Sequence, residues 1–209
     1  KKNYLALMPD EQKCAILERM GFEQVVMPDF SSFKDMEPEE FVEKMLIQGM
    51  GAKELSCGYD FTFGKGGAGT TETLCRVAER HGVKVNVVEP VTLDGEPVSS
   101  TRIRRLLQTG RCEEAVRLLG HGQLVTGRVT RGAGRGAGLG FPTANVPFAP
   151  GVLVPAFGVY RAEAEVDGVR YPACVNIGVH PTVGALPAPL LEANLIGFAG
   201  NLYGKELAV

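Results

Sequence analysis

The sequence pattern changes near residue 121, and this change restricts the possible folds more than any other feature of the chain. Before it, helical segments alternate with short β-branched runs through short links, which is typical of a parallel sheet covered by helices. After it, short β-rich stretches are separated by turns rich in Gly and Pro. We therefore expect an α/β domain over residues 1–120, followed by a small antiparallel β-barrel over residues 121–209.

The elements of the first part follow from the spacing of its apolar residues. Residues 9–30 begin with a helix that ends at Gly21 and continue into a short apolar strand at residues 25–27. The same helix–strand pair is expected twice more, over residues 38–58 and 70–88. A repeated pair of this kind predicts parallel strands.

Two short helices are expected to close the α/β domain. Three hydroxyl residues at 99–101 precede a segment rich in Arg and Leu at 102–107, and a second helix at 112–119 ends at Gly120. The β-rich stretches expected to form the barrel are residues 123–130, 158–166, 171–177 and 191–198.

Composition and charge disfavour several other classes of protein. No apolar run approaches the roughly 18 residues that a membrane helix requires. A pI of about 6.0 gives no overall attraction to nucleic acid. The 5 cysteines are widely spaced and contain no Cys-x-x-Cys pair, so neither a disulfide framework nor a zinc site is indicated. We expect a cytoplasmic protein without nucleic-acid or membrane partners, and the sequence predicts no oligomeric state.

The segment with the most chemical information lies at the start of the expected barrel. Glycine occupies every second position from 132 to 140, so backbone N–H groups are accessible to a phosphate that approaches closely. We expect Gly134, Gly136 and Gly138 to surround such a phosphate, with Arg135 adding positive charge.

Two side chains that carry oxygen follow the glycines. Thr143 and Asn145 are two residues apart and share a side if the segment is extended. Hard oxygen ligands beside phosphates suit Mg²⁺. Two alternatives stay open for the whole segment, a flexible hairpin with solvated arginines and an RNA-binding surface. Phe141 is the only aromatic residue of the Gly-rich stretch, so residues that could stack on bases are scarce.

The string Gly138-Leu-Gly-Phe-Pro-Thr-Ala-Asn145 closely resembles the signature of the riboflavin kinases. The resemblance implies that the Gly-rich loop holds ATP phosphates, that Thr143 and Asn145 organise Mg²⁺ and phosphate, and that Glu192 is the general base. The sequence Glu192-Ala-Asn194 departs from the usual Glu-x-His of this family. Further matching motifs follow in the expected order: Gly158-Val-Tyr160, Asn176-Ile-Gly178, Pro181-Thr182, Glu192 and Asn201-Leu-Tyr-Gly204.

Two motifs of the first part resemble the adenylyltransferase module of bacterial FAD synthetases. They are Gly58-Tyr-Asp-Phe-Thr-Phe-Gly64 and Ser99-Ser-Thr-Arg-Ile-Arg104. A helix start with hydroxyls and arginines can bind an anion, whereas an ordinary N-cap with solvated arginines is the alternative. The resemblance implies that flavin and ATP are bound by Asp60, Phe61, Phe63, Ser99, Ser100, Thr101, Arg102 and Arg104.

Together these motifs resemble the bacterial bifunctional riboflavin kinase/FMN adenylyltransferases. The resemblance implies a partial Rossmann-like nucleotidyltransferase domain, a barrel of the riboflavin kinase type, and conversion of riboflavin through FMN to FAD with ATP and Mg²⁺. The family's His-x-Gly-His motif does not occur in these residues. We therefore expect a first domain that is incomplete at its N-terminal end. The resemblance also implies a kinase domain that is incomplete at its C-terminal end, because the sequence stops before the family's usual closing helix. A non-catalytic flavin- or nucleotide-binding module is the alternative.

Overall fold

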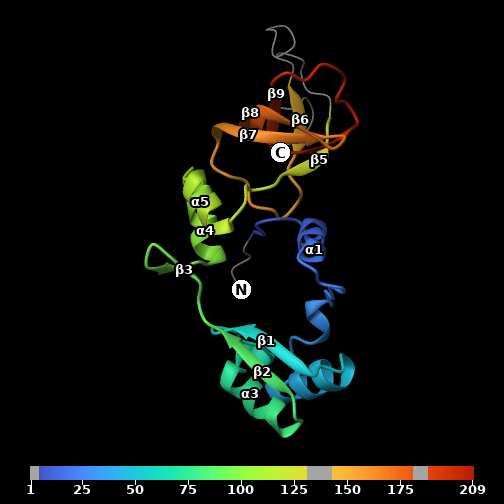
Figure 1. Cartoon of the computed structure of the whole chain (residues 1–209), viewed down its shortest axis with the longest axis vertical. Coiled ribbons are helices and arrows are strands. Elements are labelled where there is room, and N and C mark those ends of the chain that lie inside the picture. Colours follow the sequence, from blue (N-terminus) through green and yellow to red (C-terminus); the bar gives the residue numbers. More distant parts are fainter. Residues whose placement is uncertain (1–4, 131–142, 181–187) are drawn as a thin grey trace. The chain divides into compact units, whose positions relative to one another are not determined.

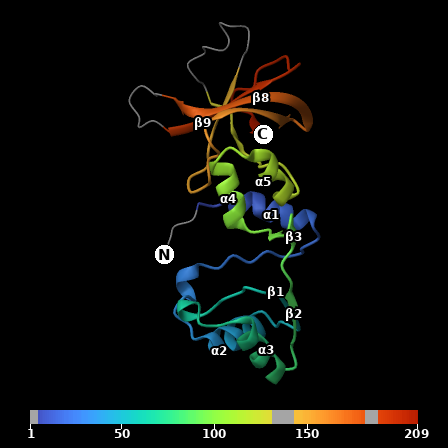
Figure 2. The ribbon, with the colours of Figure 1, turned by 90° about the vertical axis from the view of Figure 1, so that its left-hand side faces the viewer.

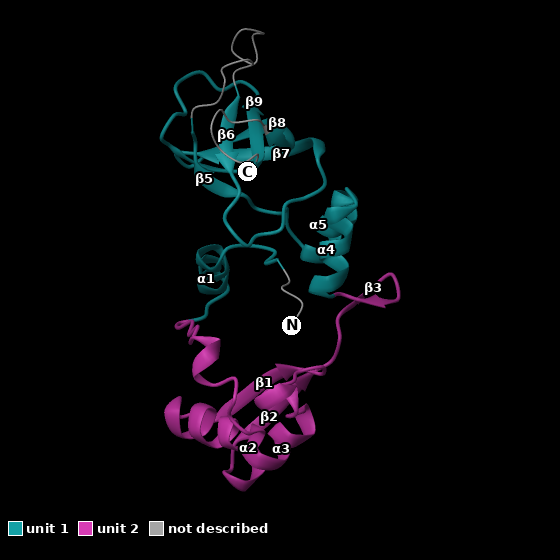
Figure 3. Cartoon of the chain, turned by 180° about the vertical axis from the view of Figure 1, so that it is seen from behind, with its two compact units in different colours: residues 1–22, 99–209 teal, residues 23–98 magenta. Residues whose placement is uncertain are grey.

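The computed structural model describes residues 5–130, 143–180 and 188–209, which form two compact units (Figure 3). Unit 1 combines residues 1–22 with residues 99–209, and unit 2 consists of residues 23–98. Unit 2 is therefore inserted between two segments of unit 1. No helix among the described residues combines the length and the apolar character needed to cross a membrane.

Unit 2 is a small α/β unit built on two parallel strands, β1 (Glu54–Gly58) and β2 (Lys84–Val88), in which Leu55 lies opposite Val85. Helix α3 (Thr71–Arg80) connects the two strands and packs against them (Figures 1 and 2). Its N-cap is Thr70, whose Oγ1 accepts a hydrogen bond from the Thr73 N–H at 3.4 Å. The other elements of this unit are η1 (Phe30–Ser32), α2 (Pro38–Glu40), the π-helix η2 (Phe41–Gly49), η3 (Lys65–Gly67), α3 (Thr71–Arg80), β3 (Thr92–Leu93) and β4 (Glu96–Pro97).

The prediction of a strand at residues 25–27 is wrong. Residues 25–27 form no ladder, although their composition favours a strand. Val26 and Met27 are 56% and 50% exposed. A strand needs a hydrogen-bonded neighbour and a surface to bury its side chains, and neither is present for this segment among the described residues.

The helices of unit 1 begin and end close to the predicted positions. They are α1 (Asp10–Arg19), α4 (Ser100–Gln108) and α5 (Cys112–Leu119). In α4, buried Ile103, Leu106 and Leu107 follow the i, i+3, i+4 spacing of a helix with one apolar face. Helix α5 ends at Gly120, whose φ of 73° is the left-handed conformation that glycine adopts without steric cost.

Six antiparallel strands of unit 1 form a nearly closed barrel in the order β5-β10-β7-β8-β9-β6. A bridge between Thr130 and Asn145 joins the two ends of this order. The strands are β5 (Thr126–Arg128), β6 (Ala144–Pro147), β7 (Gly158–Val166), β8 (Val169–His180), β9 (Ala188–Leu195) and β10 (Glu206–Ala208). The predicted α/β domain followed by an antiparallel barrel is thus confirmed as a fold class.

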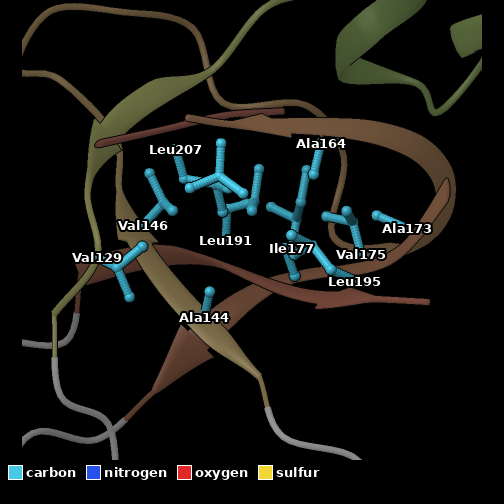
Figure 4. Close-up of a cluster of buried hydrophobic side chains, with 12 residues drawn as sticks. Val129, Ala144, Val146, Ala164, Ala173, Val175, Ile177, Leu191, Leu195 and Leu207 are labelled. Carbon is cyan, nitrogen blue, oxygen red and sulfur yellow. The ribbon is translucent and has the colours of Figure 1, made fainter. Parts of the chain in front are cut away.

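The period-two alternation of strands separates the barrel into a packed inside and a polar outside. Figure 4 shows the inside, where apolar side chains from different strands meet. On β9, Leu191, Ala193 and Leu195 are buried in this core, so Glu192 and Asn194 lie on the opposite face of the strand. The apolar pattern of the strand therefore determines that Glu192 is on the outer surface of the barrel.

Candidate functional site

Three polar residues lie side by side on the outer face of the barrel. Glu192 on β9 is directly opposite Asn145 on β6, and on its other side it is directly opposite Asn176 on β8. Residues opposite each other on neighbouring strands have Cβ atoms about 4.5–5.5 Å apart, so their side chains can touch. We call Asn145, Glu192 and Asn176 the polar row. It unites two residues predicted as functional with one to which the sequence assigned no role.

The Glu192 carboxylate accepts a hydrogen bond from the neighbouring strand β8. The Asn176 Nδ2 donates a hydrogen bond to Glu192 Oε2 at 3.3 Å, and both side chains are half-buried. The buried neighbours Leu191 and Ala193 fix the backbone of Glu192 in the barrel wall. A carboxylate on a rigid strand suits a group that must accept a proton at a defined place.

Asn145 carries a buried polar atom that has no hydrogen-bond partner within residues 5–130, 143–180 and 188–209. Its side chain is 5% exposed, and its Oδ1 accepts no hydrogen bond from the described residues. A buried acceptor without a partner costs about 1–3 kcal/mol, and a bound ligand, ion or water molecule at this place would satisfy it.

The residues around Asn145 fit the predicted magnesium site. Thr143 directly precedes β6, two residues from Asn145, and so adds a second neutral oxygen on the same side of an extended segment. No group of three His, Cys, Asp or Glu able to hold a metal occurs in the described part of the chain. A cation here would need oxygens from the substrate phosphates, which is how proteins commonly bind Mg²⁺. The predicted phosphate-binding residues Gly134, Arg135, Gly136 and Gly138 lie outside the described residues.

Unit 1 also contains a cavity of about 750 Å³ whose walls come from α1, α4, α5 and the barrel, including core residues and exposed residues of β7. None of Thr143, Asn145, Asn176 and Glu192 lines it. Its wall includes Tyr160, whose hydroxyl donates a hydrogen bond to the Ala156 carbonyl. The cavity is therefore distinct from the polar row, and Tyr160 of the Gly158-Val-Tyr160 motif belongs to the cavity.

The thiol of Cys112 lies beside Tyr160 in the wall of this cavity. Burial raises the pKa of the Cys112 thiol, although its hydrogen bond with Tyr160 opposes that shift. Burial also raises the pKa of Tyr160, and neighbouring Cys112 raises it further. A raised thiol pKa leaves less thiolate at neutral pH, so Cys112 is suited to packing rather than to reaction.

The cysteines should therefore differ in their reaction with a thiol reagent. At pH 8 we expect exposed Cys174 to react at least about ten times faster than Cys112, because Cys112 is half-buried and burial raises the pKa of its thiol. Mass spectrometry of labelled peptides at successive times measures the two rates. The same reaction in denaturant is the control, and there the rates should converge. Equal rates in the folded protein would contradict the burial of Cys112.

The predicted flavin loop of unit 2 follows the carboxyl end of β1. Asp60 is exposed, whereas Phe63 is 6% exposed and belongs to the apolar core of the unit. Phe61 stacks on Phe63 with ring centroids 5.3 Å apart. Ligands bind at the carboxyl ends of strands in open α/β sheets, which suits Asp60. Phe63 supports the loop from within, and its contact with flavin stays a prediction.

A glycine next to Phe63 offers a test of this packing. A Cβ on Gly69 would lie 2.7 Å from the Phe63 ring, closer than atoms can pack. We expect Gly69→Ala to lower the free energy of unfolding of unit 2 by about 1–3 kcal/mol through overpacking. Urea unfolding measures the change. Gly122→Ala in unit 1, where a Cβ meets nothing within 4 Å, is the matched control and should change it little.

The predicted anion site at residues 99–104 forms the start of α4 in unit 1. Ser99 is the N-cap, and its Oγ accepts a hydrogen bond from the Arg102 N–H at 3.2 Å. Ser100 and Thr101 are exposed. Arg104 donates from Nε to the Leu5 carbonyl at 2.8 Å. Ser99 thus caps the helix, as the alternative interpretation of this segment predicted. The phosphate-binding role of the segment stays a prediction.

Two family models together match nearly the whole chain. Residues 1–102 match the model for FAD synthetase, and residues 119–209 match the model for riboflavin kinase. The boundary between the two matches lies close to the change of pattern near residue 121.

Whole proteins with both modules are similar to this chain. It is 37% identical over 190 residues to the bifunctional riboflavin kinase/FMN adenylyltransferase of Pseudomonas fluorescens, which covers 90% of this chain and 61% of that protein. It is 34% identical over 206 residues to the enzyme of the same name from Bacillus subtilis, which covers 97% of this chain and 65% of that protein.

A solved structure is similar over the same length. It is a crystal structure described as a macrolide-efflux protein from Streptococcus pneumoniae, with a TM-score of 0.85, 31% identity, and coverage of 97% of this chain and 65% of that one. The chain thus spans less than two thirds of the length of these proteins, with 61% to 65% covered. Because both family models match in sequence order and the curated relatives share one name, the chain belongs to the family of bifunctional riboflavin kinase/FMN adenylyltransferases.

Proposed function

We propose that this chain phosphorylates riboflavin with ATP to give FMN and ADP, and that the whole protein also converts FMN and ATP to FAD and pyrophosphate. The observation that carries the kinase proposal is the polar row, which places a carboxylate beside a buried oxygen that has no hydrogen-bond partner in the described part of the chain. Phosphoryl transfer needs a positioned nucleophile, neutralised phosphate charge and an acceptor for the proton of the attacking hydroxyl.

Each residue of the site has a role in this reaction. Glu192 accepts the proton of the ribityl 5′-hydroxyl. At the same time the hydroxyl oxygen forms a bond to the γ-phosphorus of ATP, and the bond between that phosphorus and the bridging oxygen of the leaving ADP breaks. Thr143 and Asn145 would hold Mg²⁺ through their side-chain oxygens. When bound, Mg²⁺ neutralises charge on the phosphate oxygens. The Gly-rich loop would contact the phosphates through its backbone N–H groups and one guanidinium, with Gly134, Arg135, Gly136 and Gly138 as the binding residues.

The adenylyltransferase half is proposed on its sequence motifs and on the family-model match to residues 1–102. Asp60, Phe61 and Phe63 would contribute to flavin binding, and the start of α4 with Arg102 and Arg104 would contribute to phosphate binding. We place the boundary between the two functional domains near residue 120, where α5 ends.

A chromatographic assay with riboflavin, ATP and Mg²⁺ that follows FMN and FAD separately tests this function. We expect FMN to form and its formation to stop when EDTA removes the metal. A folded sample that binds riboflavin but forms neither product would contradict the enzyme and favour a non-catalytic flavin-binding module. FMN without FAD would limit the activity of these residues to the kinase half.

A further inference from the structure

We propose that Asn176 is a positioning residue for the kinase reaction and that it orients the carboxylate of Glu192 toward the riboflavin hydroxyl. This proposal rests on the proposed kinase function. The hydrogen bond from Asn176 Nδ2 to Glu192 Oε2 at 3.3 Å carries it, because it joins two strands at directly opposite positions.

The position of Asn176 argues against a purely structural role. Asn is disfavoured inside strands, yet Asn176 lies in the middle of a 12-residue strand, between the buried core residues Val175 and Ile177. Its side chain points to the outer face, so it adds nothing to the apolar core. The polar contact that the structure assigns to it is with the carboxylate of Glu192.

Glutamate has three rotatable side-chain bonds, so a general base of this type needs an anchor to stay near its substrate. One carboxylate oxygen bound by a neighbouring amide restricts the rotation that would turn the carboxylate away. The contact is longer than a typical charge-assisted hydrogen bond of about 2.7–2.9 Å. Catalytic hydrogen bonds are often long without substrate and shorten in the complex.

This chain has Glu192-Ala-Asn194 where the family usually has Glu-x-His. The residue that supports the base can therefore differ in this chain. Asn194 lies opposite Cys174, one step along the outer face from the pair of Asn176 and Glu192. The register thus selects Asn176, rather than Asn194, as the residue directly opposite the base. Sequence spacing alone would have pointed to Asn194.

Three variants of Asn176 separate the hydrogen bond from packing and charge. Asn176→Leu keeps the approximate shape without a donor, Asn176→Ser restores a donor, and Asn176→Asp places a second carboxylate opposite Glu192. We expect kcat for FMN formation to fall about tenfold in the Leu variant, less in the Ser variant and most in the Asp variant, a size typical of lost outer-shell support. KM for riboflavin should change less than about twofold, because Asn176 acts through the base.

A matched control uses the same kind of contact elsewhere. Asn86 Nδ2 donates to Glu54 Oε1 at 2.5 Å between the two strands of unit 2. Asn86→Leu should leave kcat of the kinase reaction unchanged. Equal kcat in wild type and all three Asn176 variants, or a Leu variant as active as the Ser variant, would overturn the positioning role.

A measurement that needs no turnover distinguishes failure of this proposal from failure of the proposed function. In NMR spectra of the 209-residue chain, the side-chain amide signal of Asn176 should shift in the Glu192→Gln variant, while that of Asn86 stays in place. If wild type forms no FMN but the Asn176 signal shifts, the contact stands and the kinase function fails. If the signal does not shift, the contact is absent and the positioning proposal is overturned whatever the activity.

Discussion

Glu192→Gln should lower the rate of FMN formation by about 10²–10⁴-fold, the contribution expected from a general base. Gln has nearly the shape of Glu and keeps an oxygen opposite the Asn176 amide, so the strand pairing and the neighbouring core should persist. The loss should therefore appear in kcat, with little change in KM for ATP. Steady-state kinetics followed by chromatographic separation of FMN measures it.

Glu163→Gln is the matched control for this variant. Glu163 is an exposed carboxylate on the outer face of β7, in the same barrel but outside the polar row. The control should retain wild-type kcat, which excludes a general effect of removing one negative charge from the barrel. A Glu192→Gln rate within twofold of wild type would remove Glu192 from the role of base.

Much of the fold could be predicted because local signals and tertiary packing agree. Helix α5 was predicted over residues 112–119 with Gly120 at its end, and the structure has the same bounds and the same terminating glycine. The segment at residues 25–27 has the same quality of local signal but forms no strand. Strand formation depends on a hydrogen-bonded neighbour, which local composition does not reveal.

The candidate site was only partly predictable for a related reason. Glu192 and Asn145 were predicted through motifs, whereas Asn176 stood in a motif to which no role was assigned. Its contact with Glu192 joins residues 16 positions apart, and only the strand register brings them opposite each other. Phe63 is an example of the opposite kind. Its motif implied contact with flavin, and the structure shows that its side chain packs in the core of unit 2. Motifs identify positions, whereas burial and strand register show which side chains each position contacts in the folded chain.

Asn145→Leu should reduce FMN formation by roughly 10²-fold while leaving the free energy of unfolding unchanged or slightly higher. The activity falls because an oxygen proposed to hold Mg²⁺ near the transferred phosphoryl group is lost, and one such electrostatic contact is worth about that factor. Stability does not fall with it, because the Asn145 Oδ1 is buried without a hydrogen-bond partner among the described residues. An apolar side chain removes that unfavourable atom.

Two measurements on the same sample separate these effects. Urea unfolding gives the stability, and a Mg²⁺ titration of kcat/KM should show a weaker apparent metal affinity. Val146→Ala is the control, because the Val146 side chain is fully buried and points into the barrel core. Its truncation should lower the free energy of unfolding by about 2 kcal/mol and leave the Mg²⁺ dependence unchanged. If Asn145→Leu instead loses stability and keeps its Mg²⁺ dependence, Asn145 is a structural residue. If Asn145 instead serves the reaction, the variant should keep or gain stability and show a weaker apparent Mg²⁺ affinity. The proposed metal ligand is then lost, together with a buried Oδ1 that has no hydrogen-bond partner among the described residues.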